Sequence, residues 1–429
     1  MSSIYDVVVV GAGPGGIAAA TIAGEAGLRV CLLDDNASSG GQIWRGLHPD
    51  TARGSSHGRE FLHWMDRLQR TNCEVLSRWT AALHPAPQVL RLERDGEFRD
   101  VGFRRLILAT GARERFLPFH GWTLPGVSGA GGLQALVKGG LEVKGKRVVV
   151  AGTGPLLLAI AAALQNAGAK IQGIYEQAPL ARLAGFGLAL VSHLDKLFEG
   201  ARYGGKLWGV PYRTSAWVLR AEGADCVERV VLTDGHKQWA QDCDWLACGY
   251  HLIPNLELPR MMGCLIERRY VTVDLHQQSS IPEIACIGEL TGIGGLEKAV
   301  IEGQIAGWSA AGHEAKVKDL APRLKRMRRF AQGLDRAFAL RAELRSVPTA
   351  ETLVCRCEDV SFSDVRECSS WREAKLHARC GMGACQGRIC GAATEFLFDW
   401  KQADVRPPVF PAAVSVMAAK LDSPEPVRR

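Results

Sequence analysis

Short apolar runs and Ala-rich segments alternate along most of the chain. The run at residues 5–10 is mostly valine and predicts a buried parallel strand. The Ala-rich segment from residue 17 predicts a helix, and the apolar run 29–33 predicts a second strand. Strand, tight turn, helix and strand make a βαβ unit, so the chain opens as an α/β protein with a parallel sheet.

The same pattern occurs a second time and is enclosed by the first. A strand, a turn and a helix are predicted from residue 146, and apolar strands at 105–109, 244–250 and 281–287 lead out of and back into the first domain. The predicted fold is therefore α/β, a doubly wound, Rossmann-like protein with two dinucleotide-binding domains and a small C-terminal α-rich domain. The first domain is predicted in two halves, 1–135 and 253–312, with an inserted domain at 136–252 between them. A basic helical linker at 313–350, a cysteine-rich domain at 351–400 and a tail at 401–429 follow.

Glycines in G-x-G-x-x-G register follow the first strand. Gly11 allows the tight turn, Gly13 lets the backbone approach a pyrophosphate, and Gly16 lets helix and strand pack closely. Pro14 and Gly15 stand at the helix N-terminus, which offers free N–H groups and a positive dipole end to phosphates. The motif predicts a dinucleotide cofactor at this turn.

Two further features of the first unit agree with a cofactor site. Asp34 closes the second strand, where a carboxylate can bind a ribose hydroxyl pair, and Asp35 is the neighbouring alternative. Gly41 and Gln42 follow in a Gly-Gly-Gln loop, which combines backbone freedom with one amide side chain.

The two strands that frame the inserted domain suggest which cofactor binds. One ends in Ala-Thr-Gly, so Thr110 and Gly111 are expected against the cofactor. The later one ends in Gly288 and Glu289, which places a carboxylate near the ribityl hydroxyls of FAD. A cofactor domain split in this way favours FAD over NAD at the N-terminal site. Flavoproteins usually carry Asp at the position of Glu289.

The second glycine turn is defective. It contains Gly152 and Gly154, but Leu157 occupies the third glycine position. A leucine side chain there should push the helix away from the strand and disfavour pyrophosphate binding. Glu176 ends the next strand and could bind a ribose. NAD(P) binding is therefore not expected, and the domain either binds nicotinamide poorly or is a scaffold that binds something else or nothing.

Six of the 13 cysteines lie between residues 355 and 390. Cys355 and Cys357 form a C-x-C pair, and Cys385 and Cys390 follow on an expected helix, so these four are the predicted ligands of a [2Fe–2S] cluster. Structural zinc is the alternative, although C-x-C fits ordinary zinc ribbons poorly. The remaining two cysteines of the group are interpreted as bystanders, namely Cys380 and Cys368.

Length, charge and hydropathy narrow the class. The chain has 429 residues, a net charge of +7 and no apolar run long enough to span a bilayer. The first strand begins at once, so no signal peptide and a cytoplasmic location are expected. Most of the positive charge lies between residues 316 and 345, in a predicted amphipathic helix with a basic outer face. We therefore expect no nucleic-acid partner, and interpret this helix as packed on the body, with docking to a protein or to an anionic membrane as the alternative.

With these motifs assembled, nearly the whole chain resembles the α subunits of heteromeric flavin-dependent amino- and imino-acid dehydrogenases. That group includes D-hydroxyproline dehydrogenase, opine oxidase, hydrogen cyanide synthase and dye-linked proline dehydrogenase. The most specific feature is Cys355-Arg-Cys-Glu-Asp-Val with Arg379-Cys-Gly-Met-Gly-Ala-Cys-Gln-Gly-Arg, which is similar to the bacterioferritin-associated-ferredoxin type of [2Fe–2S] module. The resemblance implies a partner β subunit, related to D-amino-acid oxidase, that oxidises the substrate at its own flavin. Some members have a small third [2Fe–2S] subunit.

The expected function is accordingly that of an electron-transfer subunit that contains FAD and a [2Fe–2S] cluster. The sequence shows no convincing acid–base pair, nucleophile or metal-hydroxide site, so no catalytic residue for substrate chemistry is expected. One alternative is a self-sufficient NAD(P)H-dependent reductase, and another is a mainly structural subunit of the same complex.

Overall fold

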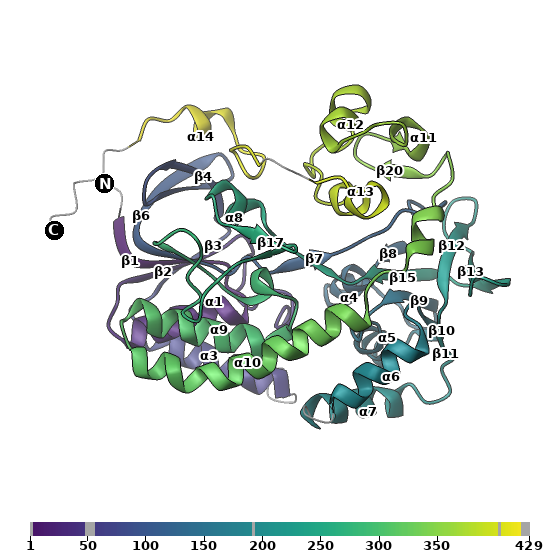
Figure 1. Cartoon of the computed structure of the whole chain (residues 1–429), viewed down its shortest axis with the longest axis horizontal. Coiled ribbons are helices and arrows are strands. Elements are labelled where there is room, and N and C mark those ends of the chain that lie inside the picture. The colour runs from purple at the N-terminus through teal and green to yellow at the C-terminus, as the bar shows by residue number, and fades with distance from the viewer. Residues whose placement is uncertain (1–2, 48–55, 191–193, 402–404, 422–429) are drawn as a thin grey trace. The chain divides into compact units, whose positions relative to one another are not determined.

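The structure is a computed structural model that describes residues 3–47, 56–190, 194–401 and 405–421 (Figure 1). Part of the predicted tail, residues 402–404 and 422–429, lies outside the described residues. The chain forms two compact units. Unit 1 comprises residues 1–113, 254–332 and 404–429, and unit 2 comprises residues 114–253 and 333–403.

Unit 1 contains a seven-stranded sheet in the order β3-β2-β1-β6-β5-β4, with β19 also paired to β6. The neighbours β3, β2, β1 and β6 pair in parallel, and β19 pairs in parallel with β6. Strand β5 pairs antiparallel with β6 on one side and with β4 on the other. The strands are β1 (Ser3–Val10), β2 (Val30–Asp34), β3 (Glu74–Ser77), β4 (Thr80–Ala86), β5 (Val89–Arg94), β6 (Glu97–Leu108) and β19 (Ile284–Cys286).

Helices and short strands complete unit 1. These are α1 (Pro14–Glu25), α3 (Ser56–Gln69), α8 (Glu257–Met261), β17 (Ile266–Glu267), β18 (Tyr270–Val271), η2 (Gly288–Thr291), α9 (Gly295–Ala310) and α14 (Val414–Ala418). The chain passes to unit 2 through β7 (Ala112–Glu114) and returns through β16 (Leu252–Pro254).

Helix α1 packs along α9, and glycines allow their backbones to touch. A Cβ atom on Gly303 would lie 2.2 Å from the carbonyl oxygen of Gly15, and one on Gly15 would lie 2.9 Å from that of Ala299. This close crossing brings the N-terminal turn of α1 to the second half of the domain, which the sequence places almost 300 residues away.

Unit 2 repeats the topology in a five-stranded sheet of order β11-β10-β9-β15-β8, whose strands are all parallel. A three-stranded antiparallel sheet, β12-β13-β14, lies in the same unit. The elements are β8 (Val127–Gly129), α4 (Ala130–Lys138), β9 (Arg147–Thr153), α5 (Leu156–Asn166), β10 (Lys170–Glu176), α6 (Leu180–Ala189), α7 (Leu194–Lys206), β11 (Tyr212–Thr214), β12 (Trp217–Glu222), β13 (Arg229–Thr233), β14 (Gln238–Asp242) and β15 (Trp245–Tyr250).

The cysteine-rich segment is part of unit 2 and packs on the inserted domain. Phe396 and Leu397 share a hydrophobic cluster with Trp217, and the indole Nε1 of Trp122 donates to the carbonyl of Leu353 at 2.6 Å. The elements of this cysteine module are η3 (Ala342–Ser346), β20 (Leu353–Cys355), β21 (Val360–Ser361), α11 (Phe362–Val365), α12 (Trp371–Ala378) and α13 (Cys390–Phe398).

The basic segment forms the long helix α10 (Glu314–Ala337). Its apolar row, with Leu324, Met327 and Leu334, is buried, and its lysines and arginines are mostly exposed, as the pattern predicts. No helix among the described residues combines the length and apolar character needed to cross a membrane. The predicted fold class is confirmed.

Candidate cofactor sites

The first glycine turn has the geometry that its spacing predicts. Gly11 has a φ of +105°, and a Cβ atom there would lie 2.4 Å from the carbonyl oxygen of Ala109. A Cβ atom on Gly16 would lie 1.8 Å from the carbonyl oxygen of Gly11. A Cβ atom on Gly13, the N-cap of α1 before Pro14, would have one neighbour within 4 Å, the Cα of Gly41 at 4.0 Å, so this side of the turn leaves room for a phosphate.

Asp34 holds this turn from the carboxyl end of β2. Its Oδ2 accepts the backbone N–H of Ala12 at 2.6 Å, and its Oδ1 accepts the N–H of Asn36 at 2.8 Å. Asp34 is buried, whereas Asp35 is exposed and accepts the side-chain amide of Asn36. The structure thus brings Asp34, but not Asp35, into contact with the glycine turn.

The Gly-Gly-Gln loop lies against the same turn. The N–H of Gly40 donates to the carbonyl of Ala12 at 2.7 Å. Gly41 has a φ of +57°, and a Cβ atom there would lie 2.9 Å from the Cα of Gly13. Gln42 is exposed beside this contact. Two loops separated in sequence therefore form one surface.

Thr110 and Gly111 lie in the turn that follows β6, and Asn255 holds this turn by hydrogen bonds. The Nδ2 of Asn255 donates to the carbonyl of Thr110 at 2.8 Å, and the hydroxyl of Thr110 donates to the carbonyl of Asn255 at 3.0 Å. The backbone N–H of Asn255 donates to the carbonyl of Gly111 at 3.0 Å. Asn255 was not among the expected site residues, because no motif surrounds it that predicts this role.

Gly288 and Glu289 lie in η2, before α9. The carboxylate of Glu289 accepts the N–H groups of Gly294 and Gly295 at 2.8 and 3.1 Å, so it holds the entry to α9. Burial raises the pKa of this carboxyl above its ordinary value. The structure thereby links the predicted Gly-acid pair to a helix N-terminus.

A buried ion pair supports η2 from below. The Nζ of Lys298 lies 2.9 Å from Oε2 of Glu302 and donates to the carbonyl of Gly288 at 2.8 Å. Oε2 of Glu302 also accepts the N–H of Gly288 at 2.8 Å. Lys298 and Glu302 were not among the expected site residues, although their i,i+4 spacing on a largely apolar helix is a recognisable signal.

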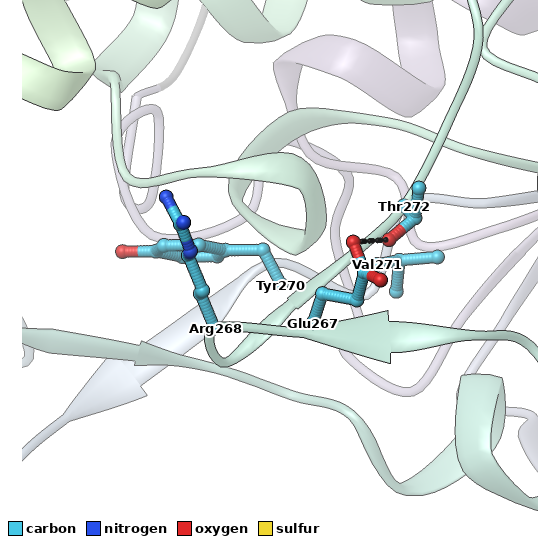
Figure 2. A pocket seen from close by; sticks show the side chains of 5 residues that line it. All are labelled: Glu267, Arg268, Tyr270, Val271 and Thr272. Carbon is cyan, nitrogen blue, oxygen red and sulfur yellow. Dashed lines mark hydrogen bonds between the residues drawn. The ribbon is translucent and has the colours of Figure 1, made fainter.

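An open hollow of about 620 Å³ lies beside the β17–β18 hairpin, which contacts η2. Figure 2 shows its five lining residues, with the hydroxyl of Thr272 donating to Glu267 at 3.3 Å. None of the predicted site residues lines this hollow. The cofactor features described above are instead built from backbone turns at the ends of β1, β2, β6 and β19.

The corresponding turn of unit 2 is closed by its own acid. Glu176 is completely buried, and its carboxylate accepts the N–H of Gly154 at 2.8 Å, the N–H of Ala178 at 2.7 Å and the hydroxyl of Thr153 at 2.6 Å. Burial raises its pKa to about 7. Leu157 is buried in the unit 2 core, where the first unit has Gly16. The carboxylate of Glu176 therefore makes its hydrogen bonds to groups of its own unit and does not face solvent.

The cysteine module gathers five of its six thiols. The Sγ atoms of Cys355, Cys380 and Cys390 all lie within 4.8 Å of one another, and all three residues are buried. Cys385 contacts Cys390 on one side and Cys357 on the other. Cys357 is exposed. The structure therefore brings together all four predicted ligands and adds Cys380, which the sequence analysis had set aside, while Cys368 lies outside the three-thiol group.

The surroundings lower the pKa of Cys355 and Cys385 and so favour their thiolate form, which is the form that binds iron or zinc. In the metal-free chain, hydrogen bonds to neighbouring thiols raise the pKa of Cys380 and Cys390. Hydrogen bonds from Cys380 and Cys390 hold the pKa of Cys355 far below its ordinary value, with help from the N–H of Gly381 at 3.4 Å. Contact with Cys390 likewise lowers the pKa of Cys385. Backbone N–H groups aimed at sulfur are the means by which proteins stabilise and tune such centres.

A glycine makes the close approach of the two cysteine segments feasible. A Cβ atom on Gly383 would lie 2.3 Å from the Cβ of Cys357 and 3.0 Å from Oε1 of Glu358. Glu358 is itself held by Arg379, whose Nε donates to Oε2 at 2.8 Å. The loop before Cys385 can therefore lie directly on the C-x-C segment.

Comparison with known proteins places this arrangement in a family. Residues 5–315 match the pyridine nucleotide-disulphide oxidoreductase family. The hydrogen cyanide synthase subunit HcnB of Pseudomonas protegens is 31% identical over 422 residues, covering 89% of each chain. An opine oxidase subunit of Rhizobium meliloti is 30% identical over 465 residues, covering 97% of this chain and 99% of that protein.

Solved structures agree on the fold. The crystal structure of L-proline dehydrogenase from P. horikoshii matches with a TM-score of 0.70 at 19% identity, over 97% of this chain and 80% of that one. Thioredoxin reductase from T. acidophilum matches with a TM-score of 0.58 at 22% identity, over 73% of this chain and 100% of that one. The thioredoxin reductase match therefore leaves about a quarter of this chain uncovered.

Proposed function

The chain belongs to the pyridine nucleotide-disulphide oxidoreductase family, and from that premise we propose that it is the electron-transfer α subunit of a heteromeric dehydrogenase or oxidase. The protein carries FAD and a [2Fe–2S] cluster, and a partner oxidises an amino or imino acid at its own flavin. The observation that carries the proposal is the cluster of five thiols in a chain that also has an open dinucleotide turn.

The FAD is proposed to bind in unit 1. Gly13 leaves space for the pyrophosphate at the N-terminus of α1, where Pro14, Gly15 and Gly16 present the first turn. Asp34 is the proposed ribose ligand, with Asp35 as the alternative. The remaining contacts are proposed to come from Gly11, Gly41, Gln42, Thr110, Gly111, Gly288 and Glu289.

The cluster is proposed to bind to two pairs of thiolates. Cys357 and Cys385 contact each other and form one pair, and Cys355 belongs to the other. The second member of that pair is Cys390, as the sequence predicts, or Cys380, because both lie close to Cys355. Single replacements by serine distinguish them, because only loss of a ligand lowers the iron content; Cys368→Ser is the matched control. A stoichiometric zinc content in place of iron would instead support a structural metal site.

The partner is proposed to be a flavoprotein similar to D-amino-acid oxidase, with a small [2Fe–2S] protein as a third component of some complexes. The support comes from relatives named as subunits, among them those of opine oxidase and the alpha chain of sarcosine oxidase. The proposed substrate class is an opine, as in the opine oxidase relatives, or proline or D-hydroxyproline, as the resemblance of the sequence motifs implies. A cytoplasmic location, with the complex free or peripheral on the inner membrane face, is part of the proposal.

The division of labour follows from the residues present. Bound FAD supplies two-electron chemistry and a [2Fe–2S] cluster one-electron chemistry. This chain contributes the glycine turn that binds the pyrophosphate and Asp34, which orients that turn. It also contributes the thiolates of the cysteine module, which accept hydrogen bonds from backbone N–H groups. NAD(P) is not proposed as a cofactor, because Leu157 occupies the third glycine position of the unit 2 turn and is buried in the core there.

The test is a comparison of visible spectra. The chain is purified alone and together with the polypeptides encoded beside its gene, and NADH, D-hydroxyproline, L-proline and opines are added in turn. Bleaching by an amine only when the partner is present is the expected result. Turnover of an amino acid by the isolated chain would contradict the proposal, and rapid bleaching by NADH would favour an NAD(P)H-dependent reductase. Full complex activity after removal of the cluster ligands would show that this chain is mainly structural.

A further inference from the structure

The thiols of the cysteine module are shielded on one side and open on the other. Three of them are at most 1% exposed, namely Cys355, Cys380 and Cys390. Cys357 is exposed, and Cys385, which it contacts, is half-buried. A cluster held by these thiols therefore comes closest to solvent at the pair formed by Cys357 and Cys385.

The loop beside this thiol pair exposes apolar side chains. Met382 and Ile389 are 43% and 42% exposed, and Ala384 is exposed as well. The close contact at Gly383 places this loop on the C-x-C segment, and the backbone N–H of Ile389 donates to the sulfur of Cys385. The exposed apolar side chains therefore lie beside the open side of the thiol group, where a concentration of them marks an interaction site.

Arginines border the same loop. Arg356 lies between the two cysteines of the C-x-C pair, is exposed, and pairs with no acid in the part of the chain that the structure describes. Arg379 is exposed and donates to Glu358 at 2.8 Å. Arg388 donates to the carbonyl of Cys385 at 3.2 Å, directly beside the thiol. The cations at the open side of the module are therefore all guanidinium groups, which bind carboxylates in a two-pronged geometry.

The composition of this surface is that of an interface between proteins. Methionine and arginine are enriched at the core of protein interfaces, whereas lysine, aspartate and glutamate are depleted there. Residues 379–390 contain one methionine, one isoleucine and two arginines, and neither a lysine nor an acid. We call this surface the Cys357 face and define it by five residues, namely Arg356, Cys357, Met382, Ala384 and Ile389.

Charge argues against a second copy of this chain as the occupant. Within residues 356–359 and 379–390, Glu358 is already held by Arg379, so Asp359 is the one acid that remains to pair with a neighbour. Two copies that met at this surface would bring Arg356 and Arg388 of each against those of the other. Like charges that face each other across an interface are disfavoured.

The apolar centre argues against a carrier that binds only briefly. Transient electron-transfer complexes have small interfaces, whereas the interfaces of stable complexes are larger and more hydrophobic. A stable partner would cover Met382 and Ile389 with its own apolar side chains and place carboxylates against Arg356 and Arg388. Such a partner gains from both features of the surface, and its position at Cys357 brings it to the exposed end of the thiol group.

We propose that the Cys357 face is the surface on which the flavoprotein partner docks, with carboxylates of the partner against Arg356 and Arg388. The inference rests on the proposed function, because it assigns a surface of this chain to the partner named there. It adds that the partner binds at the exposed ligand of the proposed cluster, through an apolar centre with an arginine border.

The test measures binding rather than turnover. The full chain is immobilised and titrated with the flavoprotein encoded beside its gene, by biolayer interferometry at low and at high salt. Met382→Glu and Arg356→Glu are each expected to raise the dissociation constant about tenfold or more. Arg356→Glu is also expected to weaken the salt dependence, because a charge pair is lost. The iron and flavin contents of both variants should equal those of wild type, which shows that the module is intact.

Two matched controls carry the same changes elsewhere. Leu188 is 77% exposed on α6 and Lys325 is exposed on α10, so Leu188→Glu and Lys325→Glu are expected to bind the partner like wild type. A second readout needs no variant, because hydrogen exchange at the amides of residues 382–386 is expected to slow when the partner is added.

The possible failures are distinguishable. A complex that Met382→Glu and Arg356→Glu form as tightly as wild type would overturn this inference and leave the proposed function standing. Failure of the wild-type chain to bind the flavoprotein would overturn both. A wild-type homodimer that Met382→Glu dissociates would assign the Cys357 face to a second copy and would also overturn the inference.

Discussion

Oδ2 of Asp34 lies 2.6 Å from the backbone nitrogen of Ala12, so the acid at the end of β2 directly holds the turn of the first glycine motif. Because both groups are buried or nearly so, loss of this bond leaves an N–H without a partner, which costs about 1–3 kcal/mol. Asp34 therefore orients the turn in addition to its proposed contact with a ribose.

Replacement of Asp34 by alanine is expected to weaken FAD binding at least tenfold, because the turn loses its anchor and the ribose its ligand. The measurement is the dissociation constant of FAD, from quenching of flavin fluorescence on titration of the apoprotein. Asp35→Ala is the matched control and is expected to bind FAD normally. The reverse pattern would assign the ribose to Asp35.

Gly13→Ala and Gly16→Ala are expected to fail in different ways. A Cβ atom on Gly16 would lie 1.8 Å from the carbonyl oxygen of Gly11, so this variant should lose about 1–3 kcal/mol of stability or more. A Cβ atom on Gly13 would make only an ordinary contact, 4.0 Å from the Cα of Gly41, so that variant should unfold like wild type but bind FAD poorly. Denaturant unfolding of the apoproteins and flavin content measure the two effects. Equal loss of stability in both variants would contradict the assignment of Gly13 to the cofactor.

Gly383→Ala is expected to remove the iron without removing the flavin. Its Cβ atom would lie 2.3 Å from the Cβ of Cys357, so the loop before Cys385 would have to move away from the C-x-C segment. Iron per chain should fall below half of the wild-type value, while flavin per chain stays unchanged. Ala384→Gly, at the exposed neighbouring position, should retain its iron. A Gly383→Ala protein with full iron would show that the cluster does not need this close contact.

Glu176 is expected to make the stability of the protein fall as pH rises. Burial raises its pKa from the ordinary 4.5 to about 7, so between these values the unfolded chain has released a proton that the folded chain still holds. The free energy of unfolding should therefore decline by about 3 kcal/mol across this window on account of this group, and stay level above it.

Glu176→Gln isolates this contribution. The variant should be less stable than wild type near pH 4.5. Its amide has a single carbonyl oxygen, so an NH₂ group replaces the oxygen that accepts the N–H of Gly154. The gap should narrow or reverse by pH 7, because the variant has no proton to hold. Denaturant unfolding at several pH values measures the gap, and a gap that is constant across the window would contradict the burial of an ionisable acid here.

Several features of this protein follow from its sequence alone, because they depend on residues close together in the chain. The glycine spacing from Gly11 to Gly16 requires a tight turn between strand and helix, and the structure forms it. The apolar row of α10 and the doubly wound α/β fold follow in the same way from strand and helix periodicity. Leu157 marks the second turn as different without any tertiary information.

Other features depend on elements that meet only in the folded chain. Asn255 fastens the turn at Thr110 from 145 residues away, and Cys380 joins Cys355 only because the loop at Gly381 and Gly383 folds back on β20. Whether Glu176 faces a ligand or its own turn was likewise undecided by its position at a strand end. Spacing along the chain determines local backbone geometry, whereas contact between distant side chains depends on how strands and helices pack, and this packing decided which thiols and acids are available for function.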